Sequence, residues 1–291
     1  MCKAIEVSMA FFIFINLDYF NMLRFPNCKI NIGLHITQKR DDNFHDLETI
    51  FYPLNCCDAL EIIESDKLHF EIEGQEIPGE MENNLVVKAY NLLKKDFPQI
   101  KPLHIFLLKK IPTGAGLGGG SSDAAFMLKM LNDFFNLGIA DKSLEKYALD
   151  LGSDCPFFIS NKVSYAKGRG EKLEEISLDL SSYNFVVVKP NFNISTAWAF
   201  SQIIPNDNRK SLLDIIQQPI ATWSRNLKND FEESVFQLYP KILTIKQELQ
   251  SRGAVYCSMS GSGSAVYGIF NEKQDREFIQ SLFPDCFVYV Q

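Results

Sequence analysis

Aliphatic and polar residues alternate between residues 28 and 36, close to the beginning of the chain. A period of two places successive side chains on opposite faces, so this segment predicts a β-strand with one buried and one polar face. The buried face would carry Ile30, Ile32, Leu34 and Ile36, and the polar face Lys29, Asn31, Gly33 and His35. Further strands are predicted at 47–54, 59–64, 67–73 and 103–108.

Apolar residues at helical spacing also occur in the first half of the chain and predict helices there. It runs over 84–97, after a capping Asn83 or Asn84, and again over 142–151, which ends at Gly152. Another helix follows a glycine cluster and stops at Gly138. One apolar stripe marks that helix: Met127, Met130, Leu131 and Phe134. Tyr165 to Ile176 predicts a hairpin.

The second half of the chain mixes both patterns again. Strands are predicted near 185–188, 254–259, 264–270 and 286–290, and helices at 210–217, 226–237 and 239–251. This order indicates an α+β domain over residues 183–291, after a first α+β domain over residues 22–182. We interpret residues 1–21 as an N-terminal extension, for which an unused upstream start is one explanation. Its apolar stretch is too short to span a membrane.

Five glycines are concentrated within residues 114–120, directly before a predicted helix. Glycine N–H groups can approach a ligand closely because no Cβ intervenes. A helix beginning at Ser121 or Ser122 would add free N–H donors and the positive end of its dipole. These features predict an anion site, with a nucleotide phosphate as the ligand. The whole loop comprises Pro112, Thr113, Gly114, Ala115, Gly116, Leu117, Gly118, Gly119, Gly120, Ser121 and Ser122.

Three other interpretations of this loop fit less well. A Walker A loop ends in Gly-Lys-Ser/Thr, whereas Gly120 is followed by Ser121. The dinucleotide fingerprint G-x-G-x-x-G does match, but Pro112 separates the loop from its strand and a second helix, not a strand, follows. A flexible linker is disfavoured because strong strand and helix patterns flank the glycines.

Composition and charge exclude several other classes of protein. The net charge of −7 argues against general nucleic-acid binding, and no basic run indicates a membrane surface. The seven cysteines show no C-x-x-C spacing, so we expect free thiols in a reducing cytoplasm. The four histidines, His35, His45, His69 and His104, show no metal-ligand spacing along the chain.

Phosphoryl transfer needs a phosphate cradle, positive charge, usually Mg²⁺, and a group that orients or deprotonates the attacking hydroxyl. Lys29 is the candidate cation, although on spacing alone solvent exposure is the better interpretation of this residue. Asp154 is the candidate base, with a capping role as its alternative. His35 and His45 are further candidates, although His45 lies in a polar turn.

A second glycine cluster, Ser260-Gly261-Ser262-Gly263-Ser264, lies between two predicted strands. The residues alone leave two interpretations equally open: a tight turn, or a backbone wall beside substrate or phosphate.

Several motifs together resemble the small-molecule kinases of the galactokinase, homoserine kinase, mevalonate kinase and phosphomevalonate kinase (GHMP) superfamily. Within it, they are most similar to the family that phosphorylates 4-diphosphocytidyl-2-C-methyl-D-erythritol. The loop 112–122 resembles the superfamily's phosphate loop. Four further segments match family motifs: 26–31, where Pro-Ala-Lys-Ile-Asn has one extra residue, 84–89, 152–156 and 260–263. Asp42-Asn43-Phe44-His45 resembles Asp-Gly-Tyr-His, with Phe44 replacing the tyrosine.

The resemblance implies a two-domain α+β fold, with an N-terminal domain like ribosomal protein S5 and a ferredoxin-like C-terminal domain. Lys29 and Asp154 would be the catalytic pair, and the loop 112–122 would bind the phosphates of ATP, with Mg²⁺. Asn31, Phe44 and His45 would bind the substrate, a cytidyl diphosphate sugar alcohol, with Phe44 stacking on the cytosine. The product would belong to the non-mevalonate route to isopentenyl diphosphate.

Two alternatives to this function remain. Another kinase of the superfamily is disfavoured because a small aliphatic substrate needs no base-stacking ring such as Phe44. A nucleotide sensor that has lost catalysis is disfavoured because both Lys29 and Asp154 are present.

Overall fold

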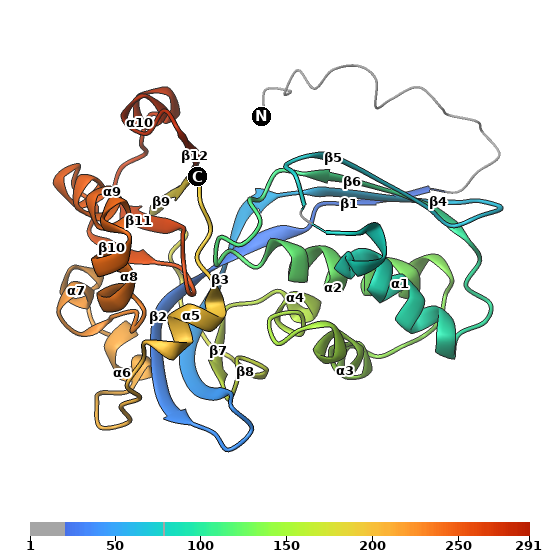
Figure 1. The fold of residues 1–291 in the computed structure, drawn as a ribbon, viewed down its shortest axis with the longest axis horizontal. Helices are drawn as coiled ribbons and strands as arrows, with labels where there is room; N and C mark the ends of the chain where they lie inside the picture. Colours follow the sequence, from blue (N-terminus) through green and yellow to red (C-terminus); the bar gives the residue numbers. More distant parts are fainter. Residues whose placement is uncertain (1–20, 78) are drawn as a thin grey trace.

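The computed structural model describes residues 21–77 and 79–291, and it has the α+β fold that the sequence predicts. Two four-stranded sheets belong to the first part of the chain (Figure 1). In spatial order, one contains β1 (Asn21–Arg24), β4 (Ala59–Glu64), β6 (Leu103–Lys109) and β5 (His69–Gly74). The other contains β2 (Asn27–Lys39), β3 (His45–Cys57), β7 (Ser164–Lys167) and β8 (Lys172–Glu175).

Four helices pack beneath the first of these sheets in the view of Figure 1. They are α1 (Leu85–Asp96), α2 (Gly119–Phe134), α3 (Asp141–Leu151) and α4 (Phe157–Ser160), with a 3₁₀ turn at Met81–Asn83. Apolar side chains of β4, β5 and β6 share one core with those of the four helices. As predicted, Asn84 caps α1, and its side chain accepts a hydrogen bond of 2.9 Å from the Val86 amide.

The third sheet contains only strands that follow residue 183. In spatial order they are β10 (Tyr256–Met259), β11 (Val266–Phe270), β9 (Asn184–Pro190) and β12 (Cys286–Val290), all antiparallel. Numbered along the chain, this order is 2-3-1-4, the arrangement of a ferredoxin-like domain. Its helices are α5 (Thr196–Ser201), α6 (Leu212–Ile216), α7 (Trp223–Asn226), α8 (Glu232–Leu238), α9 (Pro240–Ser251) and α10 (Arg276–Leu282), with a 3₁₀ turn at Ile220–Thr222.

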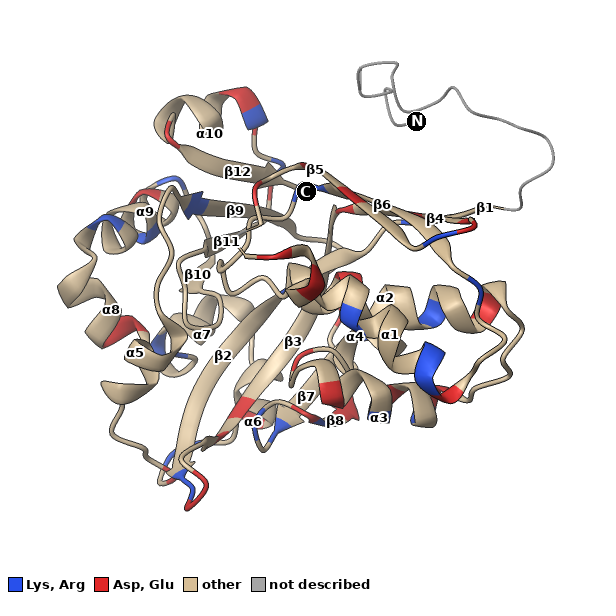
Figure 2. Cartoon of the chain, turned by 45° about the vertical axis from the view of Figure 1, so that its right-hand side comes forward, with Lys and Arg blue, Asp and Glu red and all other residues tan. Residues whose placement is uncertain are grey.

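The long β2–β3 hairpin connects the two parts of the molecule (Figure 1). Cys28, Ile30 and Ile32 of β2 share a core with apolar residues of the third sheet. The tip of the hairpin projects from the body and carries basic and acidic residues side by side (Figure 2). There Arg40 forms an ion pair with Asp42 at 3.0 Å.

The structure corrects the predicted faces of β2 in two respects. Its polar side chains are not solvated, because Lys29, Asn31 and His35 are all buried. The alternation also changes at Gly33, where φ is +69° and the pairing register with β3 shifts. Leu34 therefore lines the same cavity as Lys29, whereas His35 lines a different one. Such a bulge reverses the faces of a strand, and a period of two cannot reveal it.

Several element boundaries differ from the prediction. α2 begins at Gly119, before Ser121, and ends at Phe134 instead of Gly138. Of the predicted helix 226–237, mainly the second half is helical, as α8, because the residues directly before it lie outside any helix and Asn229 forms a parallel bridge with Leu34. The sequence did not predict α5 or α10. Of the predicted extension 1–21, only Asn21 lies within the described residues, where it pairs with Ile63. No helix in the described ranges has the length and apolar character needed to cross a membrane.

Candidate active site

A cavity of about 780 Å³ lies where β2, β3, the glycine loop and the 260–264 turn meet. Seven of the predicted site residues line it: Lys29, Asn31, Phe44, His45, Gly114, Gly116 and Asp154. The other loop residues do not line it: Pro112, Thr113, Ala115, Leu117, Gly118, Gly119, Gly120, Ser121 and Ser122. Segments far apart in the sequence therefore contribute to one cavity.

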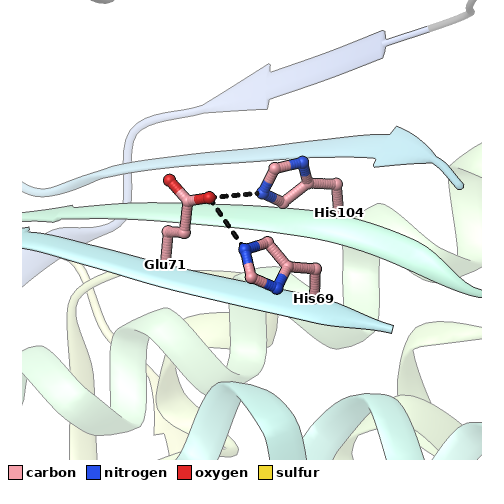
Figure 3. A group of neighbouring side chains, drawn as sticks. All are labelled: His69, Glu71 and His104. Carbon is pink, nitrogen blue, oxygen red and sulfur yellow. Dashed lines mark hydrogen bonds and ion pairs between the residues drawn. The ribbon is translucent and has the colours of Figure 1, made fainter. Parts of the chain in front are cut away.

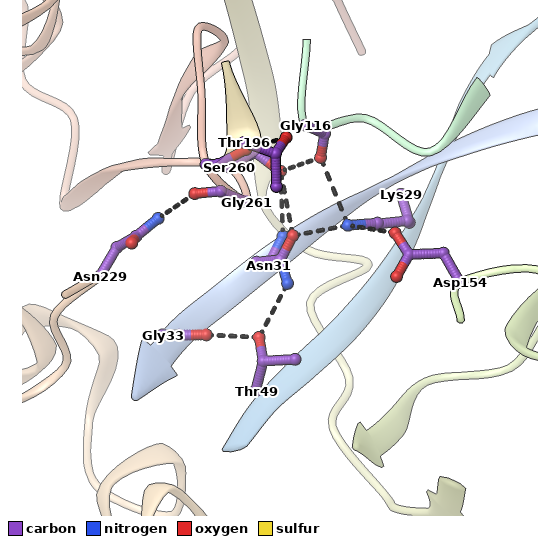
Figure 4. A network of polar contacts seen from close by, with 11 residues as sticks. Lys29, Asn31, Gly33, Thr49, Gly116, Asp154, Thr196, Asn229, Ser260 and Gly261 are labelled. Carbon is purple, nitrogen blue, oxygen red and sulfur yellow. Dashed lines mark hydrogen bonds and ion pairs between the residues drawn. The ribbon is translucent and has the colours of Figure 1, made fainter. Parts of the chain in front are cut away.

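Lys29 is the most buried cation of this cavity, with only 3% of its surface exposed. Its Nζ lies 3.2 Å from Asp154 Oδ2 and donates a hydrogen bond of 2.7 Å to Asn31 Oδ1 (Figure 4). A third contact, of 3.3 Å, reaches the carbonyl oxygen of Gly116, and the ring of Phe51 lies 4.7 Å below the ammonium. The expectation from spacing alone, that Lys29 is solvent-exposed, is therefore wrong.

Asn31 connects the surroundings of Lys29 to the third sheet. Its side-chain amide donates to Thr49 Oγ1 at 3.0 Å, while its backbone amide donates to Ser260 Oγ at 3.2 Å. Ser260 Oγ in turn donates to the Gly116 carbonyl at 2.8 Å (Figure 4). This network fixes the side-chain oxygen of Asn31 toward Lys29, because its amide nitrogen is already engaged with Thr49.

The glycine loop packs directly against the 260–264 turn. A Cβ on Gly116 would lie 2.0 Å from the carbonyl oxygen of Ser260, and its φ is +76°. Asn229 holds the other side of this turn, because its side chain donates 2.8 Å hydrogen bonds to the carbonyls of Met259 and Gly261. The second glycine cluster is therefore both a tight turn and a wall of the cavity.

Not every residue of the loop can present its side chain to a ligand. Ala115 and Leu117 pack into the apolar core, so only their backbone groups are available. Ser122 is fully buried, and its Oγ has no hydrogen-bond partner among the described residues. Gly118 precedes α2 in a left-handed conformation and provides no side-chain cap, and the first N–H groups of a helix have no intrahelical partners.

Beneath the loop lies a buried ionic cluster that sequence reasoning missed. Lys109 contacts both Asp58 and Asp123, and all three side chains are almost completely inaccessible. Asp58 also accepts hydrogen bonds from the amides of Lys110 and Ile111, directly before the loop. Burial raises the pKa of Asp123 to about 8, because desolvation of the carboxylate outweighs the attraction of Lys109. The cluster ties the strand before the loop to the helix after it.

Phe44 and His45 occupy the far end of the cavity, at the tip of β3. Phe44 is 52% exposed, and the guanidinium of Arg169 lies 4.8 Å from its ring centre. The ring of His45 stacks on Phe200, with 5.1 Å between centroids. Burial and the nearby Lys39 lower the pKa of His45 below its ordinary value, so its imidazole is neutral at pH 7.

Other cavity residues carried little signal in the sequence. Arg169 lies within the predicted turn of the 165–176 hairpin, where Gly168 and Gly170 indicate a turn but not a ligand contact. Phe200 belongs to α5, which the sequence pattern did not predict. Both residues line the cavity.

Comparison with known proteins places this chain in a family. The model of the GHMP kinases N terminal domain matches residues 84–162, and that of the GHMP kinases C terminal domain matches residues 212–287. The 4-diphosphocytidyl-2-C-methyl-D-erythritol kinase of Bacteroides fragilis is 53% identical over 257 residues, which cover 87% of this chain and 93% of the relative. That of Cytophaga hutchinsonii is 45% identical over 87% of this chain and 94% of the relative.

The chain belongs to the 4-diphosphocytidyl-2-C-methyl-D-erythritol kinase family. A crystal structure of 4-(cytidine 5′-diphospho)-2C-methyl-D-erythritol kinase superposes with a TM-score of 0.78 at 28% identity, and the match covers 92% of this chain and 98% of that one. A homoserine kinase from Cytophaga hutchinsonii matches with a TM-score of 0.61 at 15% identity, covering 91% of this chain and 94% of that one, which shows the shared fold. The kinase family implies ATP as phosphoryl donor, and its two-domain fold confirms the predicted fold class.

Replacing Gly116 with alanine should disrupt the contact between the loop and the 260–264 turn. The new Cβ would overlap a backbone oxygen and the positive φ would add strain, so we expect unfolding free energy to fall by about 1–3 kcal/mol. Gly120→Ala is the matched control, because its Cβ would meet nothing nearer than 3.8 Å. Equal thermal unfolding of the two variants would show that the contact imposes no constraint.

The raised pKa of Asp123 predicts a specific pH dependence. Between its ordinary value of 3.8 and about 8, the folded protein retains a proton that the unfolded chain releases. Unfolding free energy should therefore fall as pH rises through this range, and Asp123→Asn should remove that component. Chemical denaturation at several pH values measures the slope. Asp133→Asn, on the exposed side of the same helix, is the control and should keep the slope of unfolding free energy against pH. An unchanged slope in Asp123→Asn would contradict the raised pKa of Asp123.

Proposed function

We propose that the chain transfers the γ-phosphoryl group of ATP to the 2-hydroxyl of 4-diphosphocytidyl-2-C-methyl-D-erythritol. This reaction is a step in the non-mevalonate synthesis of isopentenyl diphosphate, and we place it in the cytoplasm. The observation that carries the proposal is the pairing of Lys29 Nζ with Asp154 Oδ2, at 3.2 Å, inside a cavity between a glycine loop and an exposed aromatic ring. Family membership supports the same reaction and substrate.

Asp154 is proposed as the group that receives the hydroxyl proton. Its side chain is 34% exposed, so it faces the cavity, and Oδ1 has no hydrogen-bond partner in the described part of the chain. Oδ2 is held by Lys29 at 3.2 Å, which fixes the orientation of the carboxylate. A carboxylate in this position can take the proton of the 2-hydroxyl as the oxygen attacks phosphorus.

Lys29 is proposed to serve both the carboxylate and the transferred group. Its ammonium has three donors, which are directed to Asp154, Asn31 and the Gly116 carbonyl. The contact to Gly116 is the longest, so this donor is the one that can turn to a phosphoryl oxygen. Asn31 lies on the substrate side of the cavity, and we assign to it the role of orienting the Lys29 ammonium toward the substrate.

The residues 112–122 are proposed to hold the phosphates of ATP. Gly114 and Gly116 line the cavity without a Cβ, and side chains at these positions would collide with Asn193 and Ser260. The N-terminus of α2 follows at Gly119 and contributes its dipole. Mg²⁺ is proposed to bind through the phosphate oxygens of ATP, which leaves Asp154 Oδ1 available for the hydroxyl proton. Bound there, the ion would neutralise charge on the transferred phosphoryl group.

The cytosine is proposed to bind at Phe44 and His45. Phe44 presents an exposed ring at the edge of the cavity, where a base can stack on it. The neutral imidazole of His45 offers one donor and one acceptor to a base edge. Stacking on Phe200 fixes the plane of this imidazole.

We also propose the domain boundary at residues 182 and 183. The first domain, 22–182, would contain the ATP-binding loop and both catalytic residues, and the second, 183–291, would close the cavity with the 260–264 turn. β9 begins at Asn184, and no described strand before it belongs to the third sheet.

Asp154→Asn should lower turnover by about two orders of magnitude or more, the usual scale for loss of a general base. The amide keeps the shape of the side chain but cannot accept the proton, so the Michaelis constant for ATP should change little. Steady-state kinetics measure both. Asp150→Asn, on the exposed surface four residues earlier, serves as control; turnover near the unmodified value in Asp154→Asn would remove this residue from the mechanism.

Phe44→Ala should raise the Michaelis constant for the cytidyl substrate and leave that for ATP nearly unchanged. Stacking of a base on an aromatic ring contributes roughly 1–3 kcal/mol, which corresponds to a rise of about 5- to 150-fold. Phe44→Tyr should have a mild effect because the ring is kept.

Phe278→Ala is a matched control for this experiment. Phe278 is 46% exposed and also lies beneath a guanidinium, that of Arg252, but it is not part of the cavity. Equal effects of Phe44→Ala on ATP and on the cytidyl substrate, together with a lower melting temperature, would indicate that the ring only supports the hairpin.

A further inference from the structure

Two histidines and one glutamate lie together on the outer face of the β1-β4-β6-β5 sheet. Phe70, between His69 and Glu71, is buried on the other face, in the core shared with the helices. His69 and Glu71 belong to β5, and His104 belongs to β6 (Figure 3). The sequence shows no metal-ligand spacing among its histidines, yet one ligand atom from each of these residues lies within 4.8 Å of the others. None of the three lines the cavity around Lys29.

The pairing of the strands explains this proximity. β5 and β6 run parallel, and His69 is the direct register partner of His104. Partners on neighbouring strands are about 4.8 Å apart, so their side chains stand next to each other. Glu71 follows His69 by two residues and therefore projects from the same face. Their alignment comes from backbone pairing, and it does not depend on the side chains themselves.

Both imidazoles are directed at one carboxylate oxygen. Nε2 of His69 lies 2.8 Å from Glu71 Oε1, and Nε2 of His104 lies 3.0 Å from the same atom (Figure 3). The ring of Phe106, 3.9 Å away between centroids, packs on His104 and restricts its orientation. Ligand atoms around a tetrahedral Zn²⁺ are roughly 3.3 Å apart, given bonds of about 2.0–2.1 Å. Small rotations of these side chains would therefore create the required spacing.

We propose that His69, Glu71 and His104 form a binding site for Zn²⁺, separate from the active site. Two neutral imidazoles and one carboxylate suit Zn²⁺, whereas Mg²⁺ and Ca²⁺ prefer sets made entirely of oxygen ligands. Water would complete the tetrahedron, because all three side chains are accessible to solvent. Glu73 projects from the same face of β5, and its negative charge adds to the attraction for a cation.

The bound ion would join an edge strand of the sheet to an inner strand. Among the described strands, β5 lies at the edge of its sheet and pairs with β6 alone, whereas β6 is an inner strand. An ion held by His69 and Glu71 on the edge strand and by His104 on the inner strand binds the folded pairing and not the unfolded chain. It therefore stabilises the sheet by RT ln(1 + c/Kd), which grows with the free Zn²⁺ concentration c. The proposed role is structural and independent of phosphoryl transfer.

Titration of the full chain with ZnCl₂, after chelator treatment and dialysis, tests the proposal by calorimetry. We expect one equivalent of Zn²⁺ to be lost in the His69→Ala/His104→Ala double variant, and affinity to fall about tenfold or more in Glu71→Gln. Glu73→Gln is the matched control, since it removes the same charge two residues further along the strand, and it should retain the site. Free thiols that bind Zn²⁺ contribute equally to every variant, so the difference isolates this site. MgCl₂ should produce no corresponding heat.

Identical stoichiometry and affinity in the unmodified chain and in both the double variant and Glu71→Gln would overturn the proposal. If the double variant does not fold, the unmodified chain still provides a test. Zn²⁺ should protect His69 and His104 from diethyl pyrocarbonate, measured on peptides by mass spectrometry, while the reactivity of His45 stays unchanged. Absence of protection would equally reject the site.

Discussion

The ammonium of Lys29 is buried in the middle of the molecule, and the parts around it are arranged to compensate its charge. An ammonium removed from water is strongly destabilising unless acceptors replace its hydration. Its three acceptors come from β2 itself, the glycine loop and the 152–156 turn. These segments are far apart in the chain: Asp154 follows its partner Lys29 by 125 residues. The requirement for acceptors therefore brings the proposed base and the proposed phosphate loop to the same place.

The segments that hold Lys29 also position the second half of the chain, through hydrogen bonds to their backbone groups. Ser260 bonds to both Asn31 and the Gly116 carbonyl, so the turn of the third sheet rests on the two segments that hold Lys29. Asn229 then fixes that turn from behind, and it is itself joined to β2 beside Leu34. The close approach at Gly116 leaves no room for a side chain. The cavity therefore has walls from both domains, and neither wall is positioned independently of the other.

Two buried ionic groups support the glycine loop in different ways. Lys29 faces the cavity and is available for chemistry, whereas Lys109 lies beneath the loop and contacts Asp58 and Asp123. The latter cluster fixes where β6 ends and where α2 begins, since Asp58 also holds the amides of Lys110 and Ile111. A loop rich in glycine loses much conformational entropy when it becomes ordered. Anchors at both ends offset part of this cost and keep the N–H groups in place.

Local pattern alone was sufficient for the features that depend on neighbours in sequence. The glycine cluster, the Asn84 cap, β4 at 59–64 and the hairpin around Gly168 could all be predicted, because turn chemistry, capping and periodicity act over a few residues. The tertiary structure decided what depends on distant contacts. It buried Lys29, which spacing alone assigned to solvent, and it changed the face of Leu34 through the bulge at Gly33. It shortened one predicted helix where Asn229 meets β2, and it placed His69 beside His104 from two different strands. Burial and strand register are set by the whole chain, so no short window of the sequence contains them.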